Sequence, residues 1–203
     1  MNFLAHFHLA GDTDGMRVGA LLGDFVKGPL TKQRINTLAL PADIVQGIKL
    51  HRQIDSYVDQ HPTLLSLGNQ LTPELRRYKG IVLDLFCDYA LSHHWRQLDS
   101  RALTDYTAEI LSVLKQNQQH MSGDARQLYR HMEQYDLLNN YSRRETIDAI
   151  IVRIGERINR VDEFRLASEQ MWQLAPLWLN EFIAIYRDIQ QFAGSQRAAL
   201  IQL

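Results

Sequence analysis

Acidic side chains stand at helical spacing inside an otherwise apolar segment of this chain. Residues 81–91 read IVLDLFCDYAL, and only Asp84 and Asp88 are polar. Because the two aspartates are four residues apart, they share one face of a helix. Two buried carboxylates without partners would each cost about 3–5 kcal/mol. We therefore expect a cation or a set of imidazoles to neutralise this face.

A second segment, residues 44–58, places His51 and Asp55 within its apolar helical face and Arg52 at the edge of that face. An imidazole and a carboxylate four residues apart can converge on a metal ion. They can equally form a plain hydrogen bond, and taken alone the pair fits that second interpretation better. The pattern leaves both interpretations open.

Further candidates flank these two segments. His6 and His8 are two residues apart, so in a helix they point about 160° away from each other, and at most one should face a shared site. Asp24 and Lys27 lie one helical turn apart in an apolar run and could simply pair with each other. His94 falls about 80° around the helical wheel from Asp84, on the same side.

The combination of these residues predicts a metal centre. Three predicted helices each bury a carboxylate, and clusters of Asp and His on facing helices are a recurrent way to build metal sites. Several carboxylates with one or two imidazoles suit Mn²⁺, Mg²⁺ or Fe²⁺. The sequence contains none of the motifs GxGxxG, GxxxxGK[ST] and GxSxG, which disfavours nucleotide-binding and serine-hydrolase chemistry.

The elements that must position these residues are all predicted to be helices, in a single all-α domain covering 1–203. Apolar residues follow the helical period throughout, strand alternation is missing, and each of the five prolines sits at a plausible helix edge. No repeat or long linker divides the chain. The predicted helices span residues 2–10, 15–27, 42–60, 63–71, 73–97, 103–119, 123–136, 143–160, 163–174 and 176–193.

Composition narrows the class of protein. The 203 residues are 45% hydrophobic and 22% charged, as in ordinary globular proteins. A net charge of −1 argues against nucleic-acid binding, and no apolar run approaches the ~18 residues of a membrane span. The first residues lack the basic start of a signal peptide. The presence of only one cysteine, Cys87, and the lack of a signal-peptide start both favour a reducing cytoplasm.

Four blocks of sequence stand out along the chain: MNFLAHFHLA, LLGDFVKG, GIKLHRQIDSYVD and DLFCDYALSHHW. In this order and with this spacing they resemble the acyl carrier protein phosphodiesterase family. The block LLGDFVKG is also similar to the LLHDIGK block of the HD superfamily of metal-dependent phosphohydrolases, whose His-Asp pair binds metal. Gly23 stands at the histidine position here. The resemblance implies an HD-like helical bundle in which His51, His6 or His8 supplies the imidazole that is absent at Gly23.

The resemblance implies an activity as well. Members of the family that it resembles would use Mn²⁺ to hydrolyse the phosphodiester of holo-acyl carrier protein. The products would be the apo-protein and 4′-phosphopantetheine. On that expectation the metal ligands are Asp24, Asp84, Asp88 and His51, with Asp55 orienting His51 without binding the metal. Lys27 or Arg52 would hold a phosphate oxygen. His94 would protonate the departing serine oxygen or serve as a further ligand.

The carrier protein that the resemblance implies is strongly acidic, so a basic docking face is expected. Arg76 and Arg77 precede the Asp84 segment, and Arg153, Arg157 and Arg160 follow one flank of the 143–160 helix. Each group could instead be an ordinary solvated flank. Two other functions stay open: an HD-like hydrolase of small nucleotides or phosphate esters, and a non-enzymatic helical binding protein. The sequence makes no prediction of oligomeric state.

Overall fold

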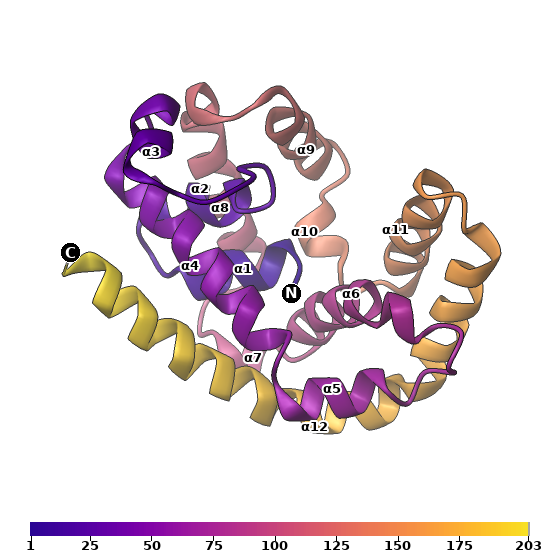
Figure 1. The fold of residues 1–203 in the computed structure, drawn as a ribbon. Coiled ribbons are helices and arrows are strands. Elements are labelled where there is room, and N and C mark those ends of the chain that lie inside the picture. Colours follow the sequence, from indigo (N-terminus) through magenta and orange to yellow (C-terminus); the bar gives the residue numbers. More distant parts are fainter. Residues whose placement is uncertain (203) are drawn as a thin grey trace.

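The protein is all-α, as the periodicity predicts. The computed structural model describes residues 1–202, which contain twelve α-helices, two short 3₁₀ turns and no strand (Figure 1). The α-helices are α1 (Phe3–Ala10), α2 (Asp14–Leu22), α3 (Lys32–Leu38), α4 (Ala42–Val58), α5 (Pro62–Gly68), α6 (Lys79–His93), α7 (Trp95–Leu98), α8 (Leu103–Gln116), α9 (Gly123–Gln134), α10 (Leu137–Asn140), α11 (Arg144–Arg157) and α12 (Val161–Ile201). The 3₁₀ turns are η1 (Arg76–Tyr78) and η2 (Gln118–His120).

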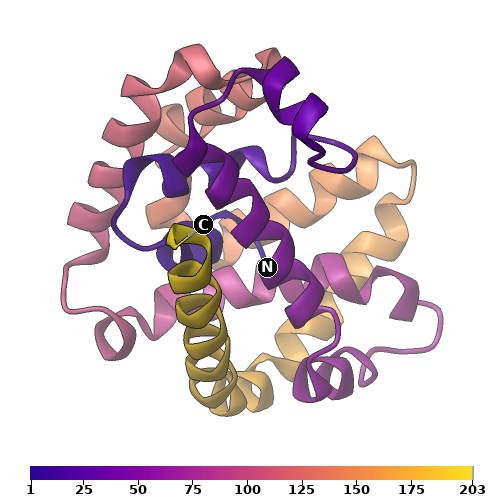
Figure 2. The same ribbon diagram turned by 60° about the vertical axis from the view of Figure 1, so that its left-hand side comes forward.

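The short helix α1 lies at the centre of the molecule. It contacts α2, α4, α6 and α12, and six of its eight residues are buried. Figures 1 and 2 both place the N-terminus in the middle of the surrounding helices. One continuous apolar core surrounds α1, so this short segment is fixed from several sides. No helix among the described residues has the length and apolar character needed to cross a membrane.

Helix α12 is a single helix of 41 residues that runs along the lower edge of the molecule in Figure 1. The prediction of two helices, 163–174 and 176–193, is therefore wrong. Pro176 removes one backbone donor. Trp178 and Phe182 just beyond it are almost fully buried, so packing holds the helix together through that position.

Two glycines allow α2 and α4 to approach closely. A Cβ atom on Gly19 would lie 2.3 Å from the Ile44 carbonyl oxygen, and one on Gly47 would lie 2.4 Å from the Met16 carbonyl oxygen. Any larger residue would separate the two helices. The close crossing places the end of α2 beside the middle of α4, where the candidate site lies.

Helix boundaries differ from the prediction at two places that matter for the site. Helix α2 ends at Leu22, so Asp24 lies in the turn that follows and not within a helix 15–27. The predicted helix 73–97 is divided into η1, α6 and α7, with His94 at the break. Helix α3 was not predicted, because its sequence KQRINTL buries no side chain and has no apolar stripe.

Candidate metal centre

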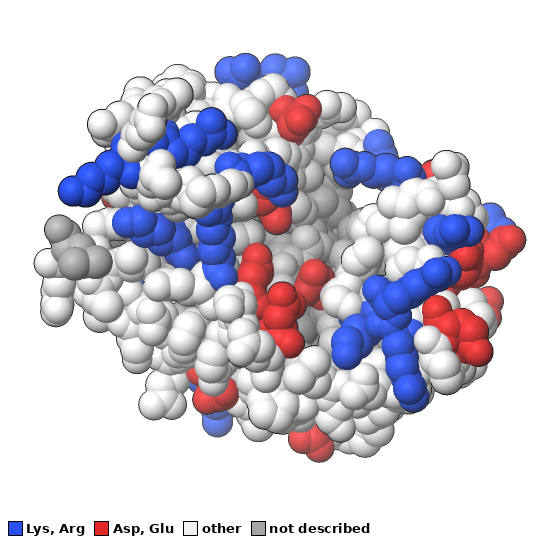
Figure 3. Space-filling model, in the orientation of Figure 1, with Lys and Arg blue, Asp and Glu red and all other residues white. Residues whose placement is uncertain are grey.

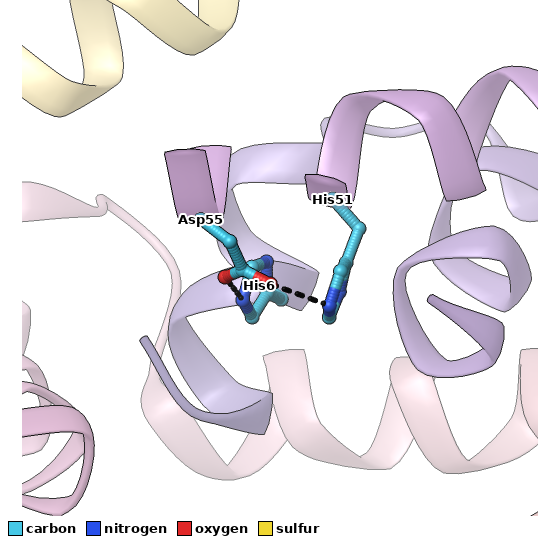
Figure 4. Close-up of side chains that lie close together, drawn as sticks. All are labelled: His6, His51 and Asp55. Carbon is cyan, nitrogen blue, oxygen red and sulfur yellow. Dashed lines mark ion pairs between the residues drawn. The ribbon is translucent and has the colours of Figure 1, made fainter. Parts of the chain in front are cut away.

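Three side chains from two helices converge at the middle of the molecule. Helix α1 supplies His6, and α4 supplies His51 and Asp55 (Figure 4). Asp55 lies between the two imidazoles: His6 Nε2 is 2.9 Å from Oδ1, and His51 Nε2 is 3.1 Å from Oδ2. The two rings stack with their centroids 3.8 Å apart. One ligand atom of each residue lies within 4.8 Å of the others, which is the spacing of a shared cation.

The tautomer of His51 is set by its backbone neighbour. Its Nδ1–H donates to the carbonyl oxygen of Ala20 at 2.8 Å, since a carbonyl can only accept. Nε2 is thereby aimed at two carboxylates, Asp55 and Asp24, whose Oδ1 is 3.6 Å away. Burial lowers the pKa of His51, but the bonds to Asp24 and Asp55 outweigh it and raise the pKa to about 9. Nε2 thus carries a proton in the metal-free chain and faces anionic oxygen.

His6 is buried and lacks a well-aligned partner. Neither ring nitrogen makes a hydrogen bond of acceptable geometry, although Nε2 is 2.9 Å from Asp55. Burial, followed by the charge on His51, lowers the pKa of His6 to about 4. His6 is therefore neutral at pH 7, and a neutral imidazole with an unsatisfied nitrogen is suited to bind a metal ion.

Further carboxylates border this cluster. The α-ammonium group of Met1 is 2.9 Å from Asp84 Oδ1 and 3.7 Å from Asp55 Oδ1, so it links the two aspartates. Burial lowers the pKa of that ammonium, but Asp84 and Asp55 outweigh the effect and raise it to about 11. Asp24 and Asp84 are half exposed. Figure 3 shows acidic side chains gathered in a hollow on this face, with Lys and Arg side chains on both sides.

The residues present fit a divalent cation. Two imidazole nitrogens and at least one carboxylate oxygen converge, and the Nε2 atom of His6 is buried without an aligned partner. Imidazole and carboxylate together are a donor set for Mn²⁺ or Fe²⁺, whereas Mg²⁺ prefers oxygen ligands. Asp55 lies among these donors, in contrast to the prediction that it only orients His51.

Asp88 has a different partner from the one predicted. Its carboxylate is fully buried, and its two oxygens accept the backbone N–H groups of Leu4 at 2.9 Å and Ala5 at 3.0 Å. Asp88 therefore caps the first turn of α1, and the prediction of a metal ligand is corrected. Burial raises the pKa of Asp88 to about 7, although the two N–H groups act in the opposite direction.

His8 and His94 also lie away from the three convergent residues. His8 faces the other side of α1, where Nδ1 is 2.7 Å from the Tyr186 hydroxyl and Nε2 is 3.2 Å from Asp99. The ring of His94 stacks on Phe182. His94 follows Asp84 by ten residues, which is about 15 Å along a helix, so a shared side of the wheel does not bring the two together.

The basic residues predicted to hold phosphate differ in their contacts. Arg52 donates to the carbonyl oxygens of Val26 and, at 2.8 Å, Gly28, so it fixes the loop that carries Asp24. Lys27 is exposed on that same loop. The guanidinium of Arg52 is thus occupied by backbone carbonyls, whereas no carboxylate of residues 1–202 lies within 4.0 Å of the Lys27 ammonium.

The arginines predicted to dock a partner are exposed, but several are already paired. Arg77 and Arg160 both approach Glu163, at 3.6 Å and 3.7 Å, and Arg76 donates to the Leu71 carbonyl. Arg153 lines a cavity of about 640 Å³ on α11 that Asp148 and Glu156 also line. Arg157 is exposed at the end of α11. Their role in binding a partner stays a prediction.

Reasoning from the sequence missed the residues that make room for the site. A Cβ atom on Gly23 would lie 2.2 Å from Cγ of His51, so His51 fills the space that a side chain at position 23 would need. The signal was present in the sequence, because Gly23 is the position at which the HD pattern has its histidine. The Ala20 carbonyl and the Met1 ammonium carry no comparable signal.

Comparison with known proteins connects the chain to one family. The sequence model of a family described as "Acyl carrier protein phosphodiesterase" matches residues 1–189. A protein of that name from Escherichia coli O6:H1 is 32% identical over 170 residues, which cover 81% of this chain and 83% of the relative. No solved structure matches.

Two other relatives with the same name match over a shorter stretch. One from Enterobacter sp. is 45% identical over 98 residues, or 48% of each chain. One from Salmonella agona is 38% identical over 120 residues, or 56% of this chain and 58% of the relative. The chain thus spans about half the length of these two relatives.

Proposed function

The chain belongs to the acyl carrier protein phosphodiesterase family, and from that premise we propose that it hydrolyses holo-acyl carrier protein. The bond cleaved would be the phosphodiester that joins 4′-phosphopantetheine to a serine of the carrier. The products would be apo-acyl carrier protein and 4′-phosphopantetheine. The observation that carries the proposal is the pair of buried imidazoles sharing the carboxylate of Asp55, because cleavage of an anionic diester calls for a cation.

We propose His6, His51 and Asp55 as ligands of a divalent cation, with Asp24 beside them. Mn²⁺ is the ion that we favour, and Fe²⁺ uses the same donors. The bound ion would supply a Lewis acid that lowers the pKa of water and offsets charge on the phosphate. The orientation of His51 by Ala20 supports this assignment, since metal-binding histidines usually donate their second nitrogen to such an acceptor.

The surrounding residues would position the substrate. Lys27 is exposed on the loop of Asp24, where its ammonium can meet a non-bridging phosphate oxygen. Arg52 keeps that loop in place through its bonds to two carbonyl oxygens. The ammonium of Met1 lies close to both Asp84 and Asp55, so it would offset the repulsion between their negative charges.

Mass spectrometry of the carrier protein tests this function directly. Holo-acyl carrier protein incubated with the enzyme and Mn²⁺ should lose the mass of phosphopantetheine, and excess chelator should prevent the loss. Free nucleotides and small phosphate esters form the parallel arm. A carrier protein left intact while a nucleotide is hydrolysed would refute the proposal in favour of a small substrate.

A further inference from the structure

The segment between α2 and α4 carries positive charge without any negative charge. Residues 25–42 contain Lys27, Lys32 and Arg34 and no Asp or Glu. All three cations are exposed, and α3, which carries two of them, buries none of its residues. Lys49 is partly exposed on the neighbouring helix α4. We call these four residues the α3 surface.

The α3 surface is not neutralised by the protein itself. Within residues 1–202, no carboxylate lies within 4.0 Å of any of its four cations. On the flank of Arg153, Arg157 and Arg160, by comparison, Arg160 approaches Glu163 and Arg153 lines a cavity together with Asp148 and Glu156, whereas Arg157 has no ion pair among the described residues. Unpaired exposed cations generate a positive potential that can steer and bind an acidic partner.

This surface also borders the metal centre. Lys27 and Asp24 belong to one loop, and Arg52, the residue after His51, holds that loop against α4. Figure 3 shows Lys and Arg side chains over α3 and α4 along one side of the acidic hollow. In the orientation that Figures 1 and 3 share, α11, which carries Arg153 and Arg157, lies on the opposite side of the hollow of Figure 3 from α3.

The chemistry of the proposed substrate restricts where a carrier protein can dock. The bond to be cleaved lies at the serine oxygen, one methylene from the carrier's own backbone. The carrier backbone must therefore come to the edge of the hollow, and its contact surface must begin there. A surface that shares a loop with Asp24 meets this condition.

From these observations we infer that an acidic surface of the carrier protein docks on the α3 surface, so that its modified serine faces the hollow. This inference rests on the proposed function for the identity of the partner. It differs from docking on the flank of Arg153, Arg157 and Arg160. Docking would act mainly on encounter and KM, since the side chains of all four cations are exposed or partly exposed.

Charge reversal distinguishes the two surfaces. The test variant is Lys32→Glu/Arg34→Glu/Lys49→Glu, which spares Lys27 because that residue is assigned to the phosphate. The matched control, Arg153→Glu/Arg157→Glu/Arg160→Glu, changes the net charge equally. We expect the test variant to raise KM for holo-carrier protein about tenfold, with kcat and hydrolysis of bis(4-nitrophenyl) phosphate unchanged. The control should leave KM unchanged, and added salt should shrink the difference.

Two results would overturn the inference: an unchanged KM in the test variant, or an equal rise in the control. If the triple variant unfolds, Lys32→Glu/Arg34→Glu serves in its place, because α3 buries no side chain. Fluorescence anisotropy of labelled holo-carrier protein separates docking from catalysis. Binding by the wild type that the test variant loses would support docking even without hydrolysis, a result that would refute only the proposed function. No binding by the wild type would refute the docking.

Discussion

His51 occupies the space that a side chain on Gly23 would fill. A Cβ atom built on Gly23 lies 2.2 Å from Cγ and 2.3 Å from Cδ2 of the imidazole. In the HD pattern a histidine stands at this position. In this chain the absence of a side chain at Gly23 leaves room for the His51 imidazole, whose Nε2 lies 3.6 Å from Asp24 Oδ1.

Gly23→Ala should displace His51 from the metal centre. The added methyl group meets the rigid ring, so the ring must move, and we expect Mn²⁺ affinity to fall about 10- to 100-fold, as for other disturbed ligands. Isothermal titration calorimetry measures this change. Gly80→Ala is the control, because a Cβ atom there has no neighbour within 4 Å. It should gain about 0.5–1 kcal/mol of stability and bind Mn²⁺ normally. Normal Mn²⁺ binding by Gly23→Ala would contradict the geometry.

Divalent metal should stabilise the protein through His6, His51 and Asp55. A ligand that binds only the folded state adds about 2.7 kcal/mol at 100 times its Kd, so Mn²⁺ should raise the Tm. His6→Gln and Asp55→Asn should each remove that rise and lower kcat by about 100-fold or more, because the activated water depends on the ion.

His8→Gln is the matched control for His6→Gln, since it lies on the same helix and faces Tyr186 and Asp99. Its Tm should still respond to Mn²⁺ in differential scanning fluorimetry. A wild-type Tm that does not change with Mn²⁺ over a wide concentration range would refute the metal site.

The pH dependence of Mn²⁺ binding should follow His51. Its pKa of about 9 in the folded, metal-free chain lies above the ordinary value of 6.5. The protonated ring therefore contributes stability that is complete below pH 6.5 and is lost as the pH rises through 9. A metal needs the neutral nitrogen, so Mn²⁺ affinity should change in the opposite direction and rise about tenfold per pH unit over that window.

Calorimetric titrations at several pH values, carried out without oxygen, measure this slope. His51→Gln should flatten it, whereas His8→Gln should keep it. An affinity that is independent of pH in the wild type would show that the metal does not displace a proton from His51.

The sequence predicted which faces carry chemistry but not which partners those faces meet. The helical wheel placed His51 and Asp55 together correctly, because residues of one helix determine their own spacing. It assigned Asp88 to a metal because the cost of burial is visible in the sequence, while the compensating N–H groups are not. Those groups belong to Leu4 and Ala5, more than eighty residues away.

A helical wheel shows the angle between two side chains but not their separation along the helix axis. His94 shares a side with Asp84 but lies near Phe182, beyond the last turn of α6. The glycines of the α2–α4 crossing gave no signal, because a missing side chain has meaning only once its neighbour is known. The class of fold could be predicted since periodicity is local, whereas the site depends on contacts between distant helices.

Asp88 should stabilise the folded protein by capping the first turn of α1. Asp88→Ala would leave two buried N–H groups, those of Leu4 and Ala5, without an acceptor. Each such group costs about 1–3 kcal/mol, so we expect the free energy of unfolding measured in urea to fall by about 2–6 kcal/mol. Asp88→Asn keeps one acceptor oxygen and should lose less.

The Asp88→Asn variant shows whether Asp88 acts as a helix cap or as a metal ligand. A cap positions His6 through the backbone of α1, so Asp88→Asn should retain the rise in Tm with Mn²⁺, whereas loss of a ligand would abolish it. The pH dependence gives a second readout, because burial raises the pKa of Asp88 to about 7, above its unfolded value. Wild-type stability relative to Asp88→Asn should therefore fall as the pH rises from about 4 to 7, where the unfolded chain releases the proton first. If Asp88→Asn folds normally but its Tm no longer rises with Mn²⁺, Asp88 is a metal ligand and not only a cap.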